Sequence, residues 1–256
     1  MPQIAHVEFF IGTSGFSYPE WRGSFYPEKF ATSKMLAFYA QRLRTVELNN
    51  TFYRMPKEDI LRGWADTTPP SFRFAPKASQ QITHRQKLAG AADSAAYLFR
   101  TLHALGDKLG PVLFQLPPFF RKDLPRLIDF LALVPVGMKV AFEFRHASWF
   151  DDTVYQALAG ARAALCIADA EDLTTPVVAT ADWGYLRLRR MDYDEAALAT
   201  WAGRLQPHSE APEANADTLA RWHSAFIYFK HEDAGRGPQL AELMGRLLGL
   251  ASIPTE

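Results

Sequence analysis

The stretch Lys139–Phe150, KVAFEFRHASWF, joins an apolar run to a group of charged and aromatic residues. In a strand, successive side chains point to opposite faces, so Glu143 and Arg145 share one face while Phe142 and Phe144 take the other. A carboxylate and a guanidinium at the end of a buried strand can transfer a proton or bind a charged substrate. The same pair can also be a structural ion pair, so the pattern leaves both interpretations open.

Other predicted strands end in polar residues as well. Glu47 and Asn49 share one face of a second strand, and two carboxylates such as Glu47 and Glu143 can divide acid and base roles if their surroundings separate their pKa values. The expected catalytic residues are Glu143, Glu47, Asp169 and His146. The expected substrate-binding residues are Lys77, Arg145, Asn49, Gln115, His84, Trp21 and Trp149. Alternatively, the carboxylates simply neutralise the cations around them.

An anion subsite is predicted near the end of the chain. Arg187 and Arg189 are two residues apart in one predicted strand, and Lys230 ends the next. The turn Gly235–Gly237 precedes a predicted helix, where free backbone N–H groups and the helix dipole favour an anion. The expected anion-binding residues are Arg187, Arg189, Lys230, Gly235 and Gly237, and the alternative is a flexible turn before a helix.

No resident cofactor is expected, although a divalent metal ion remains an alternative. Glu143, His146, Asp169 and His231 form an oxygen and nitrogen set compatible with zinc or manganese. The sequence contains neither His-x-His nor His-Glu-x-x-His, two spacings typical of metal sites.

Strand-like and helix-like stretches alternate along the chain and must position these residues. The predicted strands are 7–13, 45–51, 71–77, 112–116, 139–145, 163–169, 184–189 and 224–230. Apolar residues at helical spacing between them predict helices over 98–109, 124–134 and 240–248, with Asp123 and Asp194 as N-caps.

Eight such units indicate a (β/α)8 barrel of the TIM type, formed by one domain over residues 1–256. A doubly wound sheet is the alternative, but no Gly-x-Gly-x-x-Gly follows the first strand. The sixth crossover, 170–183, has no helical pattern and is predicted to be irregular, and 207–215 is predicted to be a mobile insertion. In such barrels the active site lies at the C-terminal ends of the strands.

Composition excludes some classes of function. Lys plus Arg and Asp plus Glu both number 28, so no overall positive field favours nucleic acid. The single cysteine, Cys166, lies in an apolar run and is expected to be a buried core residue. No apolar run is long enough for a membrane span and no signal-peptide pattern is present, so a cytoplasmic protein without membrane contact is expected.

Five motifs occur in a fixed order: IGTSGFSYPEWRGSFYP, TVELNNTFYRMP, FAPKASQQITH, LGPVLFQLPP and AFEFRHASW. Together they resemble the YecE-like family, domain-of-unknown-function family 72, and this resemblance implies a TIM-barrel fold with no established activity. Near the seventh strand the family pattern has a His-Gly pair where this chain has RLRRMDY. Near the eighth it has an Asn-rich turn where this chain has YFKHEDAGRG.

The leading hypothesis is an enzyme that acts at the barrel mouth on a phosphate-bearing sugar or nucleotide by carboxylate acid–base chemistry, as a hydrolase, isomerase or lyase. The alternative is a non-catalytic nucleic-acid-binding protein with a basic rim that consists of Arg22, Arg187, Arg189, Arg190 and Arg236. A scaffold with a vestigial site is a third interpretation.

Overall fold

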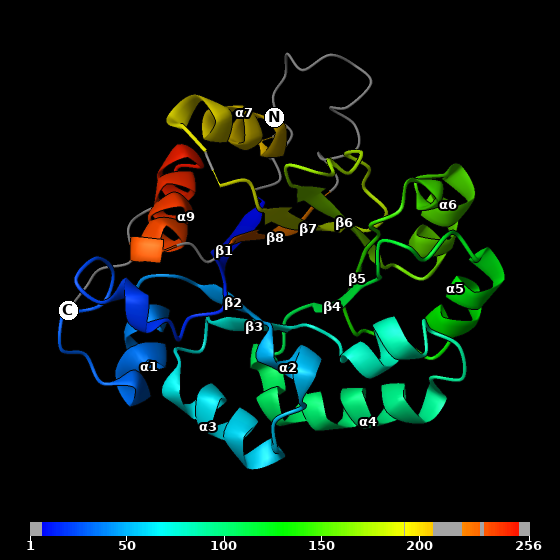
Figure 1. Cartoon of the computed structure of the whole chain (residues 1–256), viewed down its shortest axis with the longest axis horizontal. Coiled ribbons are helices and arrows are strands. Elements are labelled where there is room, and N and C mark those ends of the chain that lie inside the picture. The colour runs from blue at the N-terminus through cyan, green and yellow to red at the C-terminus, as the bar shows by residue number, and fades with distance from the viewer. Residues whose placement is uncertain (1–6, 192, 207–221, 231–232, 251–256) are drawn as a thin grey trace, which may run out of the picture.

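In the computed structural model, which describes residues 7–191, 193–206, 222–230 and 233–250, eight parallel strands form a nearly closed barrel ringed by helices (Figure 1). Neighbouring strands follow the order β3-β2-β1-β8-β7-β6-β5-β4. The strands are β1 (Glu8–Ser14), β2 (Thr45–Leu48), β3 (Arg73–Pro76), β4 (Val112–Gln115), β5 (Val140–Glu143), β6 (Ala164–Asp169), β7 (Trp183–Leu188) and β8 (Ser224–Phe229). The predicted barrel is confirmed.

The outer layer consists of helices and short helical turns. The helices are α1 (Met35–Ala40), α2 (Asn50–Tyr53), α3 (Glu58–Thr67), α4 (Ala92–Leu102), α5 (Leu124–Leu131), α6 (Asp152–Gly160), α7 (Glu195–Leu205) and α9 (Arg236–Leu247). The turns are η1 (Pro19–Trp21), η2 (Thr32–Lys34), η3 (Gln81–Arg85), η4 (His103–Lys108), η5 (Ala147–Trp149) and η6 (Asp233–Gly235). Asp123 and Asp194 accept hydrogen bonds from Arg126 N and Ala197 N, which confirms both predicted N-caps.

Side-chain alternation along the strands produces two cores. One lies between the barrel and the helices and includes Leu186 and Leu188 of β7. The other fills the barrel, where Phe10 stacks on Phe226 at a centroid distance of 4.6 Å near the N-terminal ends of the strands. Cys166 is buried in this inner core, as predicted, and burial raises the pKa of its thiol well above the ordinary value. The stacked rings therefore fill the barrel interior near the N-terminal ends of the strands.

The barrel seam between β3 and β4 is its weakest junction. β7 and β8 are paired over six residue positions, whereas β3 and β4 are joined by the isolated bridges Phe74–Leu109 and Lys77–Leu113. Backbone hydrogen bonds from Gly110 N to Phe74 O and from Ala78 N to Leu113 O support this seam. Lys77, a predicted site residue, thus lies where the strands are held least firmly.

The sixth crossover, residues 170–182, contains no helix, as predicted. It forms a bridge from Thr174 back to Asp169, and Thr180 Oγ accepts from Leu165 N and donates to Ala163 O. The predicted second strand is too long, because β2 ends at Leu48 and α2 begins two residues later. The predicted insertion at 207–215 lies outside the described residues.

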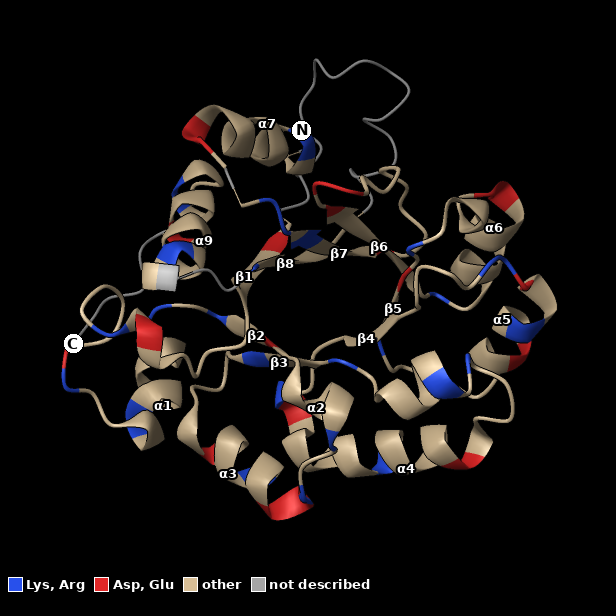
Figure 2. Ribbon diagram, viewed as in Figure 1, with Lys and Arg blue, Asp and Glu red and all other residues tan. Residues whose placement is uncertain are grey.

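No helix in the described part of the chain has the length and apolar character needed to cross a bilayer. Basic and acidic residues are interspersed along the outer helices, in keeping with the balanced composition (Figure 2).

Candidate active site

A cavity of about 420 Å³ opens at the C-terminal ends of the strands, and we call it the mouth cavity. A volume of this size can hold a small metabolite. Side chains from six strands or strand ends meet there because residues at the end of each strand, on its inner face, converge on the barrel axis. Its wall is formed by Tyr18, Asn49, Phe52, Tyr53, Lys77, Gln115, Glu143, Arg145, Ala168, Ala170, Asp172, Leu173, Arg187 and Arg189.

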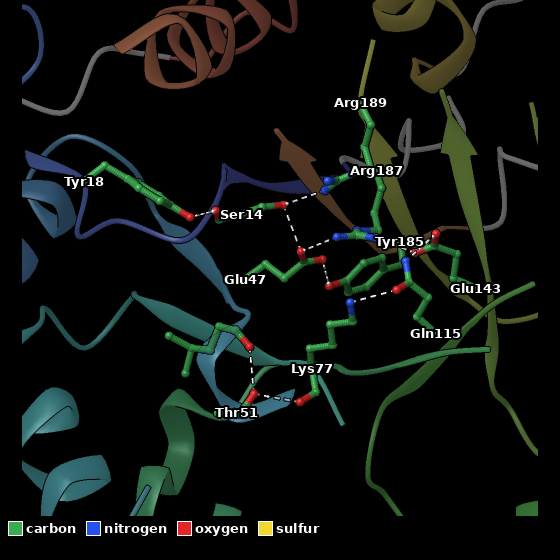
Figure 3. A network of polar contacts seen from close by, with 11 residues as sticks. Ser14, Tyr18, Glu47, Thr51, Lys77, Gln115, Glu143, Tyr185, Arg187 and Arg189 are labelled. Atoms are coloured by element: carbon green, nitrogen blue, oxygen red, sulfur yellow. Dashed lines mark hydrogen bonds and ion pairs between the residues drawn. The ribbon is translucent and has the colours of Figure 1, made fainter. Parts of the chain in front are cut away.

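Arg187 is the central residue of the inner end of this cavity. Its side chain is only 2% exposed, and it donates from Nη2 to Glu47 at 2.8 Å and from Nη1 to Glu143 at 2.5 Å (Figure 3). One guanidinium thus joins β2, β5 and β7 across the barrel. Two carboxylates on one fork make geometrically specific, charge-assisted contacts, so Arg187 is fixed in place.

A chain of hydrogen bonds extends from this centre to both walls of the cavity (Figure 3). On one side, Ser14 Oγ donates to Glu47 at 2.8 Å and accepts from Arg189 Nη1 at 3.3 Å. On the other, Lys77 Nζ donates to Gln115 Oε1 at 2.8 Å, and Gln115 Nε2 donates to Glu143 at 2.8 Å.

Glu47 and Glu143 remain ionised at neutral pH. Burial alone would raise their pKa values, but the charges of Arg187, Arg189 and Lys77 and the hydrogen bond from Arg187 together outweigh burial and lower the pKa of Glu47 to about 2. Arg187 and the Gln115 amide likewise lower the pKa of Glu143. Their surroundings therefore do not separate one carboxylate as an acid from the other as a base, which was the condition for dividing those roles between them.

The pKa of Lys77 is lowered as well, which for an amine favours the neutral form. Burial and the nearby Arg187 charge lower the pKa of its amine to about 8, against the attraction of Glu47 and Glu143. The ammonium lies 4.4 Å from the centre of the Phe52 ring, and Thr51 Oγ, 2.7 Å from the Lys77 carbonyl oxygen, anchors the backbone. Lys77 is thus an amine in the cavity wall whose charge changes near neutral pH.

Arg189 and Arg145 are the remaining cations of the wall. Arg189 makes no ion pair with any residue that the structure describes. Its hydrogen bond to the uncharged Ser14 hydroxyl is long, at 3.3 Å. Arg145 lies 3.5 Å from Asp172, a carboxylate that is largely exposed, so their attraction is weak. The wall therefore carries positive charge that the protein itself does not fully neutralise.

Three contributors to the site were not among the predicted site residues. Ser14 ends β1 on its inner face, Tyr185 donates from Oη to Glu47 at 2.8 Å, and Tyr18 donates from Oη to the Ser14 carbonyl at 2.8 Å. Tyr185 is two residues before Arg187, so alternation along β7 predicts its position. No local pattern distinguishes Tyr18 from the other rings of its loop.

The position of Asp169 differs from its predicted place among the catalytic residues. It ends β6 at the same end of the barrel, but its side chain points toward the helices, because Ala164, Cys166 and Ala168 take the inner face. Its carboxylate accepts from Arg190, from Tyr193 Oη at 3.0 Å and from Trp201 Nε1 at 3.1 Å. Its contacts are therefore structural and lie outside the mouth cavity.

The two predicted histidines are also absent from the cavity wall. His146 Nδ1 accepts from Ser148 N and so caps η5. His84 packs edge-on behind Phe52, at a centroid distance of 5.0 Å.

Both predicted tryptophans belong to the core. Trp21 is fully buried and lies 4.8 Å from the Tyr18 ring centre, so it supports a wall residue from behind. Trp149 stacks on Phe144 at 4.6 Å and donates from Nε1 to Phe120 O. Their large apolar area is better buried than exposed, which outweighs any advantage of facing the cavity.

The predicted anion-binding residues do not all lie in one place. Arg187 and Arg189 both point into the barrel, as their spacing predicted, but Arg187 is already paired with two carboxylates. Lys230, Gly235 and Gly237 do not line the mouth cavity. A Cβ on Gly237 would lie 2.5 Å from the Lys230 carbonyl oxygen, so this turn is packed against protein.

The proposed metal ligands do not converge. Glu143 lies inside the barrel, His146 caps a turn and Asp169 faces the helices, while His231 is outside the described residues. Within the described ranges, no three acidic, histidine or cysteine side chains form a group able to hold a metal ion.

Of the five arginines of the predicted basic rim, Arg187 lies inside the barrel, while Arg22, Arg190 and Arg236 are exposed and make contacts within the protein. Arg187 is buried, Arg190 pairs with Asp169, and Arg236 donates to the Tyr193 carbonyl. Arg22 donates to the Phe30 carbonyl and is exposed.

Comparison with known proteins agrees with the resemblance in the sequence. The family model described as "Protein of unknown function DUF72" matches residues 10–255. The UPF0759 protein YunF of Bacillus subtilis (strain 168) is 31% identical over 155 residues, which are 57% of this chain and 54% of YunF. The UPF0759 protein YecE of Escherichia coli (strain K12) is 30% identical over 142 residues, 55% of this chain and 50% of YecE. The chain thus matches about half the length of these curated relatives.

Two solved structures share the fold. A DUF72 family protein from Enterococcus faecalis V583 has a TM-score of 0.77 at 17% identity, covering 97% of this chain and 98% of its own. Another from Thermotoga maritima MSB8 has a TM-score of 0.74 at 24% identity, covering 94% and 99%.

Proposed function

The chain belongs to the DUF72 family of proteins of unknown function, and we propose that it is an enzyme that binds an anionic small molecule in the mouth cavity and transfers a proton through Lys77. The substrate class that fits is a phosphate-bearing sugar or nucleotide. The observation that carries the proposal is the Arg189 guanidinium, which lines the cavity without an ion-pair partner among the described residues, beside an amine whose pKa is about 8.

Arg189 supports anion binding because its guanidinium lines the cavity without an ion-pair partner among the described residues. Arg187 lies behind it, between Glu47 and Glu143. These two carboxylates offset the repulsion between the two guanidinium groups. A planar guanidinium suits a phosphate group, since its parallel N–H groups match two oxygens.

Lys77 supports catalysis because a group with a pKa near the working pH can both hold and release a proton. Glu47 and Glu143 are less suited to this role, since Arg187 keeps both ionised. We assign them the role of holding Arg187, and we assign proton transfer to Lys77. Hydrolysis, isomerisation and elimination all require such a transfer.

Sulfate binding tests the anion site without knowledge of the substrate. Sulfate at ~100-fold its dissociation constant is expected to stabilise the protein by about 2.7 kcal/mol, read as a rise in melting temperature. Arg189→Ala is expected to abolish most of this rise, whereas Arg246→Ala, at an exposed position in α9, should leave it unchanged. A wild-type protein that sulfate and phosphate do not stabilise would contradict the proposal.

The pH dependence of sulfate binding tests Lys77. Its amine is charged below a pH of about 8 and neutral above it, so sulfate should bind more weakly as the pH rises through this range. Sulfate itself stays fully ionised there, so the change reports on the protein. Lys77→Met should bind sulfate more weakly at pH 7 and lose the step near pH 8.

Turnover is tested by incubating the protein with pools of sugar phosphates and nucleotides and following them by phosphorus NMR and mass spectrometry. Conversion of one compound is expected in the wild type, with a loss of at least about 100-fold in Lys77→Met, as for a general acid or base. Binding without conversion would restrict the function to binding. Conversion that persists in Lys77→Met would remove Lys77 from the mechanism.

A further inference from the structure

A second cavity adjoins the mouth cavity, and we call it the side cavity. It has a volume of about 470 Å³ and lies between the first loop, η2 and α3. Tyr18 and Asn49 line both cavities, so these two side chains form the boundary between them.

The chemistry of the side cavity differs from that of the mouth cavity. None of its lining residues is charged, and it combines the aromatic rings of Phe16 and Trp64 with hydroxyls such as Thr32 and Ser33 and the amide of Asn50. Aromatic faces with nearby hydrogen-bonding groups suit a neutral polar ring, such as a sugar or a nucleobase.

Asn49 has an unused side chain at the boundary. It occupies the N-cap position of α2, where an asparagine usually caps the helix, yet its side chain makes no capping hydrogen bond. Among the described residues no hydrogen-bond partner of this half-buried amide is found. Its donor and acceptor are thus available to a molecule that passes between the two cavities.

Tyr18 forms the opposite side of the boundary and is held firmly. Its Oη donates to the Ser14 carbonyl, and its ring packs on Gly15, where a Cβ would approach the Oη to 2.4 Å. Gly15 has a φ of +90°, which favours glycine. The loop therefore keeps the Tyr18 ring in the wall that the two cavities share.

From this juxtaposition we infer that the side cavity is a second subsite, which takes the neutral polar ring of a substrate whose anionic group occupies the mouth cavity. The inference rests on the proposed function, since the mouth cavity must bind the anion. The substrate class is then a phosphate ester of a sugar or a nucleoside, with its ring against Trp64 and its linking atoms beside Asn49.

The test compares calorimetric affinities for inorganic phosphate, glucose 6-phosphate, AMP and UMP. At least one ester is expected to bind about tenfold or more tightly than inorganic phosphate, the effect of one or two good contacts. Sugar phosphates and nucleotides form separate arms, so the tighter class identifies the ring that the side cavity accepts.

Two variants test whether the higher affinity of the ester comes from the side cavity. Ser33→Trp, at an exposed position of η2, should fill the side cavity, and Asn49→Ala should remove the amide at the boundary. Both should abolish most of the advantage of the ester. Ser33→Trp, at a residue that lines only the side cavity, should also leave the affinity for inorganic phosphate unchanged within about twofold. Ser71→Trp, an exposed serine that lines neither cavity, is the matched control and should bind the ester like the wild type.

The possible failures are distinguishable. If Arg189→Ala abolishes phosphate binding but no ester binds more tightly than phosphate, the second subsite is overturned and the proposed anion site is left intact. The same conclusion follows if an ester binds more tightly but keeps this advantage in both Ser33→Trp and Asn49→Ala. Absence of binding by phosphate and by all three esters overturns both proposals.

Discussion

Arg187 determines the geometry of the inner end of the mouth cavity. It is buried between Glu47 and Glu143, and its Nε is buried without a hydrogen-bond partner among the described residues. A buried, unpaired donor is unfavourable by about 1–3 kcal/mol, so the ion pairs must outweigh this loss. The protein therefore accepts a local penalty to keep one guanidinium in contact with two strands.

Arg187→Met is expected to destabilise the protein by about 3–5 kcal/mol, because it leaves two buried carboxylates without their cation. Adding Glu47→Gln and Glu143→Gln to the variant should recover part of this loss, since the uncompensated charges are then removed. Arg145→Met, whose partner is exposed, should change stability by no more than about 1 kcal/mol. Urea unfolding measures the stability of the wild type and of the three variants. An Arg187→Met variant as stable as the wild type would disprove the buried pairing.

The pairing of Glu47 with Arg187 also makes the free energy of unfolding depend on pH. The pKa of Glu47 is lowered from 4.5 to about 2, so its contribution is fully present above pH 4.5 and is lost as the pH falls through about 2. In Arg187→Met this dependence should weaken, because the charge that lowers the pKa is gone.

At the scale of the elements, the position of β1 depends on one glycine. Gly12 has an ordinary backbone conformation, but a Cβ there would lie 1.9 Å from the Thr45 carbonyl oxygen of β2 and 3.0 Å from Tyr39 Oη. Tyr39 donates to that same carbonyl and accepts from Thr13 N, so it ties α1 to both strands. Close approach of β1 and β2 brings Ser14 within reach of Glu47.

Gly12→Ala is therefore expected to destabilise the protein by about 3 kcal/mol or more, since the strands must separate to admit a methyl group. Gly63→Ala is the matched control. Gly63 lies inside α3, and a Cβ there would meet no atom within 4 Å, so this change should stabilise the protein by about 0.5–1 kcal/mol. Thermal unfolding measures the stability of both variants. Equal effects of the two substitutions would show that the close approach of β1 to β2 does not exclude a methyl group at position 12.

At the scale of the whole molecule, the barrel is unevenly closed. β8 is paired with both β1 and β7 over six positions, whereas the seam between β3 and β4 depends on two isolated bridges. Lys77 lies on this seam, so local opening there would move the amine away from Gln115. Few hydrogen bonds across a junction allow it to open at a lower free energy than the rest of the sheet.

Hydrogen exchange followed by mass spectrometry is expected to show faster exchange of the Gly110 and Ala78 amides, which bridge the seam, than of the amides between β7 and β8. Phosphate, if it binds beside Lys77, should slow exchange at the seam more than elsewhere. Equal protection of both junctions would show that the barrel is closed as firmly at the seam as at its other edges.

The sequence by itself determined the barrel and the identity of its inner residues. Strands alternate with period two, so the residue order alone assigns Glu47, Glu143, Arg187 and Arg189 to the inner face, and all four lie there. The same alternation places Tyr185 on the inner face, two residues before Arg187, whereas Asp169, which was predicted to be catalytic, faces the helices. The predicted helix N-caps and irregular sixth crossover likewise follow from short-range patterns.

Only the tertiary structure decided which charges meet. Pairing of Arg187 with Glu47 and Glu143 depends on the tilt and stagger of three strands that are distant in sequence, and no local pattern contains these quantities. That pairing holds the pKa of Glu47 low and leaves Arg189 without an ion-pair partner among the described residues. Trp21 and Trp149 lie in the core for a similar reason, since burial of an aromatic ring depends on which neighbours surround it in space. Residue types and the strand faces they occupy are encoded locally, whereas the pairing of charges within the site depends on the closed barrel.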